Sequence, residues 1–386
     1  MDIPPHFRNS VSPPAVAALL QCTNLGGMEK VAYSLFEQLQ ARGFTIKIAT
    51  ARVWGPGAPR VQAVDPAVKA FDYRGKFGWR SFPAFQRHVR AICQAGETVW
   101  VIGTCASCLA AARLTGKRML LSHHYHHFEG RTSRLRWTAF YLAAGFRLDA
   151  ITYPTEFTRN EAYRIAPWLK SKMHVVRNGF DVHYVNEEKR LADKQAARVA
   201  LRMPPDGFLV GNGGWLIPRK RFDVFLRTAQ LVSRRLPDAR FYICGGGPEE
   251  AKLRKLAGDL GITDRVYFPG WVQDMTPYYR AWDVQLFNTD FDALGNIPLE
   301  AAAHGCLCVA SCTYGGLSEF IKNGLTGYLL AQHDPEKLAA AIFQLASRPT
   351  QALEIREHAI TLLKQEFSNE KALAFYEKHF RASLPR

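Results

Sequence analysis

The sequence predicts an α/β protein with two doubly wound domains, each a parallel sheet flanked by helices. Short apolar runs alternate with amphipathic stretches, so that one strand–loop–helix unit recurs about every 25 to 30 residues. The chain has 386 residues, which is more than one hydrophobic core usually serves. A polar, charged stretch at residues 182–205 separates the two halves, as a linker would.

Composition and charge narrow the class of protein further. Hydrophobic residues make up 47% of the chain and no long low-complexity run interrupts it, which indicates a globular protein. No apolar run approaches the ~20 residues that a membrane span requires, and residues 1–10 contain no apolar h-region. We therefore expect a cytoplasmic protein. The formal net charge of +16 predicts an anionic partner, either nucleic acid, an acidic ligand or an anionic membrane surface.

The first half of the chain predicts a parallel sheet. A strand at 16–21, a helix at 30–42 and a strand at 45–51 form a βαβ unit. The remaining elements expected here are strands at 99–103, 118–122 and 150–153, and helices at 82–94 and 158–165. Gly26 and Gly27 follow the first strand and let the backbone approach a ligand closely, although a Gly-x-Gly-x-x-Gly order is absent. A plain tight turn is the alternative.

The second half predicts another sheet of the same kind. Its elements are strands at 208–214, 240–244, 284–288 and 307–310, and helices at 221–235, 298–304, 335–347, 352–366 and 369–381. Arg219, Lys220 and Arg221 follow the glycine-ended strand at 208–214, where cations can neutralise a diphosphate. Plain surface charge is the alternative for this run.

The stretch 288–312 is the most informative part of the chain. A loop with Gly295 precedes a short helix that we expect to start at Pro298, and such a helix N-terminus is a natural site for a phosphate. Glu300 lies one turn inside, where a carboxylate can accept two hydrogen bonds from ribose hydroxyls. Asp292 lies on the loop, where a second ligand group would rest. An ordinary doubly wound sheet with no phosphate at the helix start is the alternative.

Two short clusters suggest other chemistry. Cys105 and Cys108 form a Cys-x-x-Cys pair, but no thioredoxin-like context surrounds them, so buried reduced thiols are expected. Four histidines within residues 123–127 suggest a metal, yet no carboxylate or spaced partner accompanies them. We expect no metal at this cluster.

Several motifs resemble those of the retaining GT-B glycosyltransferases of family four. Asp292, seven residues and Glu300 resemble that family's Glu, seven residues, Glu signature, with Asp in place of the first Glu. Further matches follow in the family's order along nearly the whole chain: Gly26-Gly27, Asn178-Gly179, Lys220, Gly246-Gly247-Pro248 and Gly315-Gly316-Leu317-Ser318-Glu319. Six ordered matches are specific where each alone is weak.

The resemblance implies the GT-B fold, in which two doubly wound Rossmann-like domains face a cleft. It divides the chain into an acceptor-binding domain at 1–181, a linker at 182–205, a nucleotide-sugar-binding domain at 206–366 and a C-terminal helix at 367–386. In this fold the final helix usually packs back on the first domain, and we expect that here.

The resemblance also implies roles for single residues. His124, favoured over His123, corresponds to a family histidine close to the transferred sugar, and Asp292 to the acid that contacts the hexose. Lys220 corresponds to the lysine that binds the donor phosphates, and His124, Lys220 and Asp292 are the expected catalytic residues. The family arginine is replaced by Trp215, so Arg219 or Arg221 must supply the second cation. The other expected donor-binding residues are Gly26, Gly27, Gly246, Gly270, Trp271, Gly295, Asn296, Ile297 and Glu300.

The implied activity is the retaining transfer of a hexose from a nucleotide-diphosphate sugar to a glycan or glycolipid acceptor, in the synthesis of a cell-surface polysaccharide or lipopolysaccharide. No cofactor is implied, because the sugar nucleotide is a substrate. No metal is implied either, because Lys220, an adjacent arginine and the helix N-terminus before Glu300 can stabilise the charge of the leaving diphosphate. Asp290-Phe291-Asp292 spells the Asp-x-Asp metal signature of another glycosyltransferase fold, which we interpret as coincidence. A GT-B nucleotide-sugar epimerase and a non-catalytic nucleotide-sugar-binding protein are the alternatives.

The segment 130–141 interleaves arginines with large aromatic residues. An amphipathic helix that is basic on one side and aromatic on the other suits a membrane interface, whereas a solvated face covering a core is the alternative. Nucleic acid is not an expected partner, since no stacking module or zinc-finger spacing accompanies the charges. We expect a lipid-linked acceptor and peripheral attachment to the inner face of the cell membrane.

Overall fold

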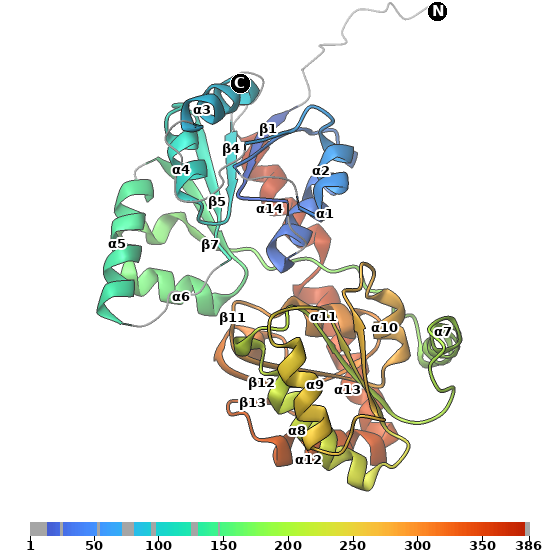
Figure 1. Cartoon of the computed structure of the whole chain (residues 1–386). Helices are drawn as coiled ribbons and strands as arrows, with labels where there is room; N and C mark the ends of the chain where they lie inside the picture. Colours follow the sequence, from blue (N-terminus) through green and yellow to red (C-terminus); the bar gives the residue numbers. More distant parts are fainter. Residues whose placement is uncertain are drawn as a thin grey trace, which may run out of the picture. The chain divides into compact units, whose positions relative to one another are not determined.

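The computed structural model describes residues 14–23, 26–51, 55–71, 81–93, 98–124, 130–145 and 147–382. The chain forms two compact units (Figure 1). Unit 1 comprises Met1–Tyr153, Glu161–Val176 and Ala372–Arg386, and unit 2 comprises Pro154–Asn160 and Arg177–Lys371. Each unit contains one parallel sheet covered by helices, which confirms the predicted α/β class with two doubly wound domains.

Unit 1 is built on a seven-stranded sheet with the order β3-β2-β1-β4-β5-β6-β7. Its strands are β1 (Ala15–Leu20), β2 (Thr45–Thr50), β3 (Lys69–Ala70), β4 (Thr98–Ile102), β5 (Arg118–Ser122), β6 (Leu148–Tyr153) and β7 (Met173–Val175). Its helices are α1 (Gly27–Ala41), α2 (Ala58–Val64), α3 (Phe82–Cys93), α4 (Ala106–Arg113), α5 (Arg131–Gly145) and the 3-10 helix η1 (Pro167–Lys172), together with the part of α6 (Glu156–Ile165) from Glu161 onward. The strand order reverses between β1 and β4, so the carboxyl ends of these two strands flank the topological switch point.

The central strand β1 is buried on both faces because successive side chains of a strand point to opposite sides. Leu19 packs with Phe85 of α3 on one face, and Leu20 packs in the core formed with Phe36 of α1 on the other. Such strands read as continuous apolar runs, which is why this strand could be predicted from sequence.

The last helix, α14 (Asn369–Arg381), contributes to the core of unit 1. Its Tyr376 ring lies 4.7 Å from the ring of Trp100, and its hydroxyl oxygen lies 3.2 Å from Ser122 Oγ. Leu373 and Phe380 are buried in the same core. The end of the chain therefore completes a domain whose other residues end at Val176.

Unit 2 is built on a six-stranded parallel sheet with the order β10-β9-β8-β11-β12-β13. Its strands are β8 (Leu209–Gly213), β9 (Arg240–Cys244), β10 (Val266–Gly270), β11 (Val284–Asp292), β12 (Leu307–Gly315) and β13 (Tyr328–Leu330). Its helices are α7 (Glu187–Ala200), η2 (Pro218–Lys220), α8 (Phe222–Arg235), α9 (Glu250–Asp259), α10 (Thr276–Ala281), α11 (Asn296–Ala303), η3 (Leu317–Glu319), α12 (Pro335–Ser347) and α13 (Pro349–Glu366). The switch point lies between β8 and β11.

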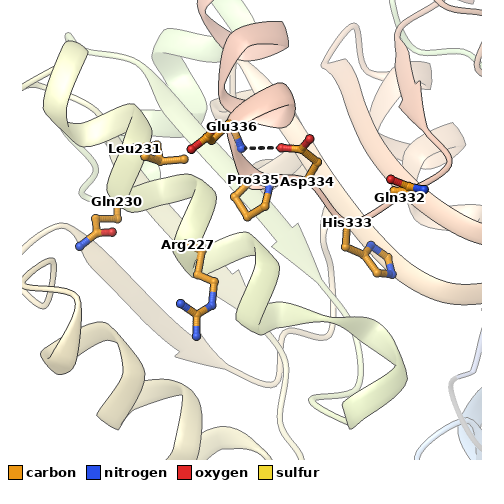
Figure 2. A pocket seen from close by; sticks show the side chains of 8 residues that line it. All are labelled: Arg227, Gln230, Leu231, Gln332, His333, Asp334, Pro335 and Glu336. Carbon is orange, nitrogen blue, oxygen red and sulfur yellow. Dashed lines mark hydrogen bonds between the residues drawn. The ribbon is translucent and has the colours of Figure 1, made fainter.

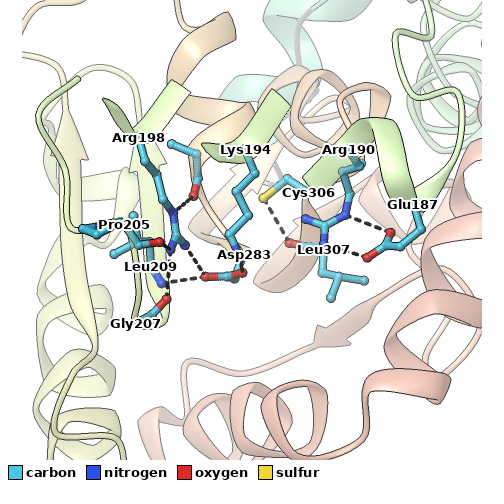
Figure 3. A network of polar contacts seen from close by, with 12 residues as sticks. Glu187, Arg190, Lys194, Arg198, Pro205, Gly207, Leu209, Asp283, Cys306 and Leu307 are labelled. Atoms are coloured by element: carbon cyan, nitrogen blue, oxygen red, sulfur yellow. Dashed lines mark hydrogen bonds and ion pairs between the residues drawn. The ribbon is translucent and has the colours of Figure 1, made fainter. Parts of the chain in front are cut away.

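The polar stretch 182–205, expected as a linker, contains helix α7. The guanidinium of Arg198, 2% exposed, donates a hydrogen bond to the Asp283 carboxylate at 2.8 Å (Figure 3). It also donates to the backbone carbonyls of Ala281, Pro205 and Gly207. A buried charge is tolerated when it is paired and fully hydrogen-bonded, so this arginine anchors α7 to unit 2. High polarity here reflects ion pairing within the unit.

A shallow depression of about 510 Å³ lies on unit 2 between α8 and α12 (Figure 2). Its lining residues are Arg227, Gln230, Leu231, Gln332, His333, Asp334, Pro335 and Glu336. Asp334 is the N-cap of α12 and accepts hydrogen bonds from the amides of Glu336 and Lys337. None of the residues expected at the site lines this depression.

Candidate functional site

The candidate site of unit 2 lies at the carboxyl edge of its sheet, where three loops are joined by backbone hydrogen bonds. The Gly214 amide donates to Cys244 O at 2.9 Å, and the Gly245 amide donates to Gly270 O at 2.7 Å. Gly245 has a φ of +147°, and a Cβ atom there would lie 1.9 Å from Gly214 O, so only glycine fits. Ligands of open parallel sheets bind at this edge, close to the switch point.

Asp292 and Lys220 meet at this edge. Lys220 Nζ donates to Asp292 Oδ2 at 2.6 Å, and the Gly295 amide donates to Asp292 Oδ1 at 3.0 Å. Asp292 was expected on a loop, but it is the last residue of β11 and pairs with Gly315 of β12. The two oxygens of the Asp292 carboxylate are therefore engaged by different partners.

The two arginines beside Lys220 have different environments. Arg221 forms two hydrogen bonds of 3.0 Å with Asp223 and one of 3.2 Å with Asp290, and the Asp223 carboxylate raises the pKa of its guanidinium. Arg219 instead donates to Phe291 O at 3.1 Å, and its Nη1 lies 3.9 Å from Asp292 Oδ2. Arg219 and Lys220 therefore share one carboxylate, while Arg221 is paired with two others.

Helix α11 begins at Asn296, two residues before the expected start at Pro298. Gly295 is its N-cap with a φ of +77°, a left-handed conformation that favours glycine. The side-chain oxygen of Asn296 accepts a hydrogen bond of 2.9 Å from Asn178 Nδ2. Ile297 lies close enough to Gly214 that a Cβ atom there would touch its Cδ1 at 3.5 Å. The N-terminus of α11 is thus held in register with the loops after β8 and β11.

Glu300 lies one turn inside α11 and is half-buried. Its Oε2 accepts a hydrogen bond of 2.8 Å from the hydroxyl of Tyr279 on α10. Burial, together with the Glu300 charge, raises the pKa of Tyr279 well above its usual value, so the phenol stays protonated and donates. Sequence reasoning missed Tyr279, because α10 was not predicted and nothing in the chain near Tyr279 marks it as a partner of Glu300.

Two tryptophans lie at the same edge, Trp215 after β8 and Trp271 after β10. Their rings are 5.3 Å apart in an edge-to-face arrangement, and both side chains are about half exposed. Gly270, which precedes Trp271, has a φ of +80°. A Cβ atom on Gly246 would meet nothing within 4 Å. This pair of rings offers partly exposed apolar surface at the carboxyl edge of the sheet.

In unit 1, Gly26 is the N-cap of α1 and Gly27 is its first residue. A Cβ atom on Gly26 would lie 2.5 Å from Glu29 Oε2, so the glycine lets the Glu29 carboxylate fold back on the helix start. Burial raises the pKa of Glu29. Asn24 and Leu25, the other residues of this loop, lie outside the described residues.

The two histidines that follow β5 differ in burial. His123 is fully buried, with its Nδ1 3.0 Å from the hydroxyl of Tyr141. His124 is partly exposed, and burial lowers its pKa to about 4, so its imidazole is neutral at pH 7. The other two histidines of the cluster, His126 and His127, lie outside the described residues. Of the described pair, His124 is the residue that keeps some exposed surface.

Helix α5 packs its aromatic residues inward. Tyr141 is buried, and Trp137 and Phe140 pack against the core of unit 1, so the aromatic face covers a core. The outer face carries the exposed Leu135, 70% accessible, and Leu142, 47% accessible. Arg131, Arg134 and Arg136 are exposed on the same helix. The aromatic side expected at a membrane interface therefore covers a core instead, and leucines are the large apolar residues that this helix exposes.

Two absences concern only the part of the chain that is described. No helix there has the length and hydropathy needed to cross a bilayer. No group of three or more His, Cys, Asp and Glu side chains is arranged there to hold a metal ion.

Comparisons with known proteins agree with the two α/β units described above. A family model described as "Glycosyltransferase Family 4" matches residues 25–184, and one described as "Glycosyl transferases group 1" matches residues 205–348. The crystal structure of Anabaena HepE in complex with UDP and glucose superposes with a TM-score of 0.81 at 17% identity, covering 95% of this chain and 99% of that one.

Two relatives are more similar in sequence. The lipopolysaccharide core biosynthesis glycosyltransferase LpsE of Rhizobium meliloti is 32% identical over 173 residues, covering 45% of this chain and 49% of LpsE. D-inositol 3-phosphate glycosyltransferase 2 of Catenulispora acidiphila is 30% identical over 223 residues, covering 55% of this chain and 51% of the relative. The chain thus spans about half the length of the curated relatives it matches.

Two Rossmann-like units with parallel sheets and these structural neighbours define a protein of the GT-B fold class. The two family matches together span most of the chain. The chain belongs to the family-four glycosyltransferases.

Proposed function

We propose that this protein transfers a hexose from a nucleotide-diphosphate sugar to a glycan or lipid-linked acceptor. The observation that carries the proposal is the convergence of Lys220, Arg219 and the N-terminus of α11 at one sheet edge, with Glu300 one turn inside the helix. Two cations and a helix N-terminus suit a diphosphate, and a carboxylate beside them suits the ribose. The binding of UDP and glucose by HepE supports a UDP-sugar as the first donor to test.

In this proposal the cations of the donor site stabilise the departing diphosphate. As the C1–O bond to the diphosphate breaks, negative charge grows on the phosphate oxygens, and Lys220, Arg219 and the α11 amides stabilise it. The acceptor hydroxyl attacks C1 from the same face, and its proton passes to the departing phosphate, so the anomeric configuration is retained. This route needs no metal, because the protein's own cations balance the charge.

In the same scheme, the role of Asp292 depends on whether the donor is bound. Without donor, one of its oxygens is engaged by Lys220 and the other by the Gly295 amide. Donor phosphates would compete for Lys220, which releases one carboxylate oxygen toward the hexose. Asp292 would thus pair with Lys220 before the donor binds and contact the hexose after it has bound.

Of the two candidates for the second phosphate cation, the contacts favour Arg219. Arg221 would have to leave two carboxylates, Asp223 and Asp290, to bind a phosphate. Arg219 stays beside Lys220 and is held mainly by a backbone carbonyl and the face of Phe291.

The acceptor class rests on α5 and on the relatives. LpsE is a lipopolysaccharide core enzyme by its name, and the Catenulispora enzyme is named for an inositol phosphate acceptor. Arginines and exposed leucines on one helix suit an anionic lipid surface, so we favour a lipid-linked acceptor and a peripheral association with the inner face of the membrane.

The proposal is tested by incubating the protein with labelled UDP-, GDP- and ADP-sugars in EDTA, with and without a lipid-linked glycan. Transfer with retained anomeric configuration, read by NMR of the product, is the expected result. Epimerised donor would identify an epimerase, and tight donor binding without turnover would identify a non-catalytic sensor. Activity that requires added manganese would overturn the metal-free mechanism.

A further inference from the structure

The Cys-x-x-Cys pair of unit 1 lies at a strand–helix junction that the sequence did not reveal. Cys105 is the N-cap of α4 and is partly exposed, whereas Cys108 lies one turn inside the helix and is fully buried. The junction follows β4 at the switch point, and Cys108 Sγ lies 3.5 Å from the carbonyl oxygen of Leu20, the last residue of β1. An accessible thiol at a helix start with a buried thiol behind it is the arrangement of a redox-active dithiol.

We propose that Cys105 and Cys108 are a thiol–disulfide modification site, in which Cys105 is attacked or oxidised first and Cys108 resolves the product to an intramolecular disulfide. Cys105 is the N-cap of α4 and Cys108 is its third residue, so both thiols belong to the first turn of one helix. Helical neighbours three residues apart have Cβ atoms about 5 to 6 Å apart. A disulfide needs about 3.5 to 4.5 Å. A small shift at the first turn of α4 therefore suffices.

The surroundings of the two cysteines suit Cys105 to react first and Cys108 to resolve the product. The neighbouring Cys108 side chain lowers the pKa of Cys105 against the opposing effect of burial, and the Ser107 hydroxyl, 3.0 Å away, adds to this, bringing the pKa to about 5. Cys105 is therefore a thiolate at neutral pH. The neighbouring Cys105 side chain and complete burial raise the pKa of Cys108, so its thiol stays protonated and donates to the carbonyl oxygen of Leu20.

Five other described thiols differ from Cys105. Burial raises the pKa of Cys93, Cys306 and Cys312 to about 12, and it raises that of Cys244 and Cys308 as well. Buried protonated thiols of this kind are inert. Of the described thiols, Cys22 and Cys105 are the two that are partly exposed, so reactivity is expected at these positions rather than at the buried ones.

Glutathione disulfide is a suitable oxidant, and the reaction balances in two steps. The Cys105 thiolate attacks one sulfur of glutathione disulfide, the S–S bond breaks, and one glutathione leaves and takes up a proton. Cys108 then loses its proton and attacks the Cys105 sulfur of the mixed disulfide, which releases the second glutathione. The protein loses two electrons and two protons, and glutathione disulfide gains them as two thiols.

The test uses the whole protein in buffers of graded glutathione disulfide to glutathione ratio, quenched with an alkylating agent and mapped by peptide mass spectrometry. The expected product is a Cys105–Cys108 disulfide that reduced glutathione reverses. Cys108→Ser should accumulate a mixed disulfide of Cys105 with glutathione, and Cys105→Ser should accumulate neither product. The readout is thiol state, so its failure is distinguishable from failure of the proposed transferase activity.

Cys22→Ser is the matched control, because Cys22 is a partly exposed thiol of the same sheet edge, hydrogen-bonded to Glu29. This variant should form the Cys105–Cys108 disulfide as the unmodified protein does. A disulfide between Cys22 and Cys105 would overturn the assigned pair.

The pH profile of alkylation gives a second measurement that does not depend on disulfide formation. Between pH 6 and 8 the rate at Cys105 should stay nearly constant, because the thiolate is already formed above its pKa of about 5. At pH 6 it should exceed that of free N-acetylcysteine by roughly tenfold, after allowing for the lower nucleophilicity of a low-pKa thiolate. A rate that rises tenfold per pH unit would overturn the proposal.

Discussion

Lys220 Nζ lies 2.6 Å from Asp292 Oδ2, although the two residues are 72 positions apart in the sequence. The pair joins the loop after β8 to the end of β11, on the two sides of the switch point of unit 2. The same carboxylate accepts the Gly295 amide at the start of α11. One side chain therefore aligns a cation and a helix N-terminus, the two features on which the proposed diphosphate site depends.

Replacing Lys220 by alanine should lower kcat by about 10² to 10³-fold, because charge on the diphosphate grows as the bond breaks. The affinity for the free nucleotide should fall much less. Steady-state kinetics with a UDP-sugar, together with calorimetric titration of UDP, checks both quantities. Lys220→Arg keeps the charge and should recover part of the rate. A change confined to KM would point to uniform binding of substrate and transition state instead.

Glu300→Gln should weaken turnover of the nucleotide sugar by about 10²-fold or more, because it removes a charge-assisted contact to the ribose hydroxyls. Tyr279→Phe removes only the hydrogen bond that holds Glu300, so the expected loss is about five- to tenfold. Tyr278→Phe is the matched control on the same helix and should leave kcat/KM unchanged. Near-normal kinetics of the Glu300→Gln variant would remove Glu300 from the site.

Arg219→Ala and Arg221→Ala distinguish the two candidates for the second phosphate cation. The first change should reduce kcat/KM by about 10²-fold, as expected for loss of a charge-assisted phosphate contact. The second removes partly exposed ion pairs with Asp223 and Asp290, so the activity should stay within about fivefold. The reverse order of effects in parallel assays would assign the phosphate contact to Arg221.

The outer face of α5 should bind anionic lipid. Changing Arg131, Arg134 and Arg136 together to Glu should reduce sedimentation with phosphatidylglycerol vesicles by about 100-fold or more, since each cation near such a surface contributes about 1 kcal/mol. The control is a triple change to Glu on α9, at Lys252, Arg254 and Lys255, which alters the net charge equally. Equal losses in both triple variants would indicate a nonspecific charge effect and would favour a soluble acceptor.

Leu135→Ser tests the apolar part of the same surface. This side chain is 70% exposed, so its replacement should leave thermal stability nearly unchanged. Vesicle binding should weaken at high salt, where the arginines are screened and the leucine contributes most of the remaining attraction. Unaltered binding at every salt concentration would exclude insertion of α5 into the interface.

Much of the fold was determined by local patterns. Continuous apolar runs predicted the buried parallel strands, and helices such as α12 and α14 were predicted with the residues at which they begin and end, because periodicity and capping residues are local properties. The ordered motifs from Gly26 to Glu319 also predicted the family, since glycines at strand ends and a carboxylate at a helix start are recorded in the sequence itself.

The tertiary structure decided the identity of the partners. Polarity at 182–205 suggested a linker, but Arg198 becomes a buried anchor because Asp283 and three carbonyls converge on it from other segments. The pairing of Lys220 with Asp292, the support of Glu300 by Tyr279 and the packing of the α5 aromatic face all depend on contacts between distant segments. The environment of Cys105 likewise exists only once α4 has formed beside β1. Local sequence sets which groups are present, whereas hydrogen bonding and burial after folding set which of them meet and with what charge.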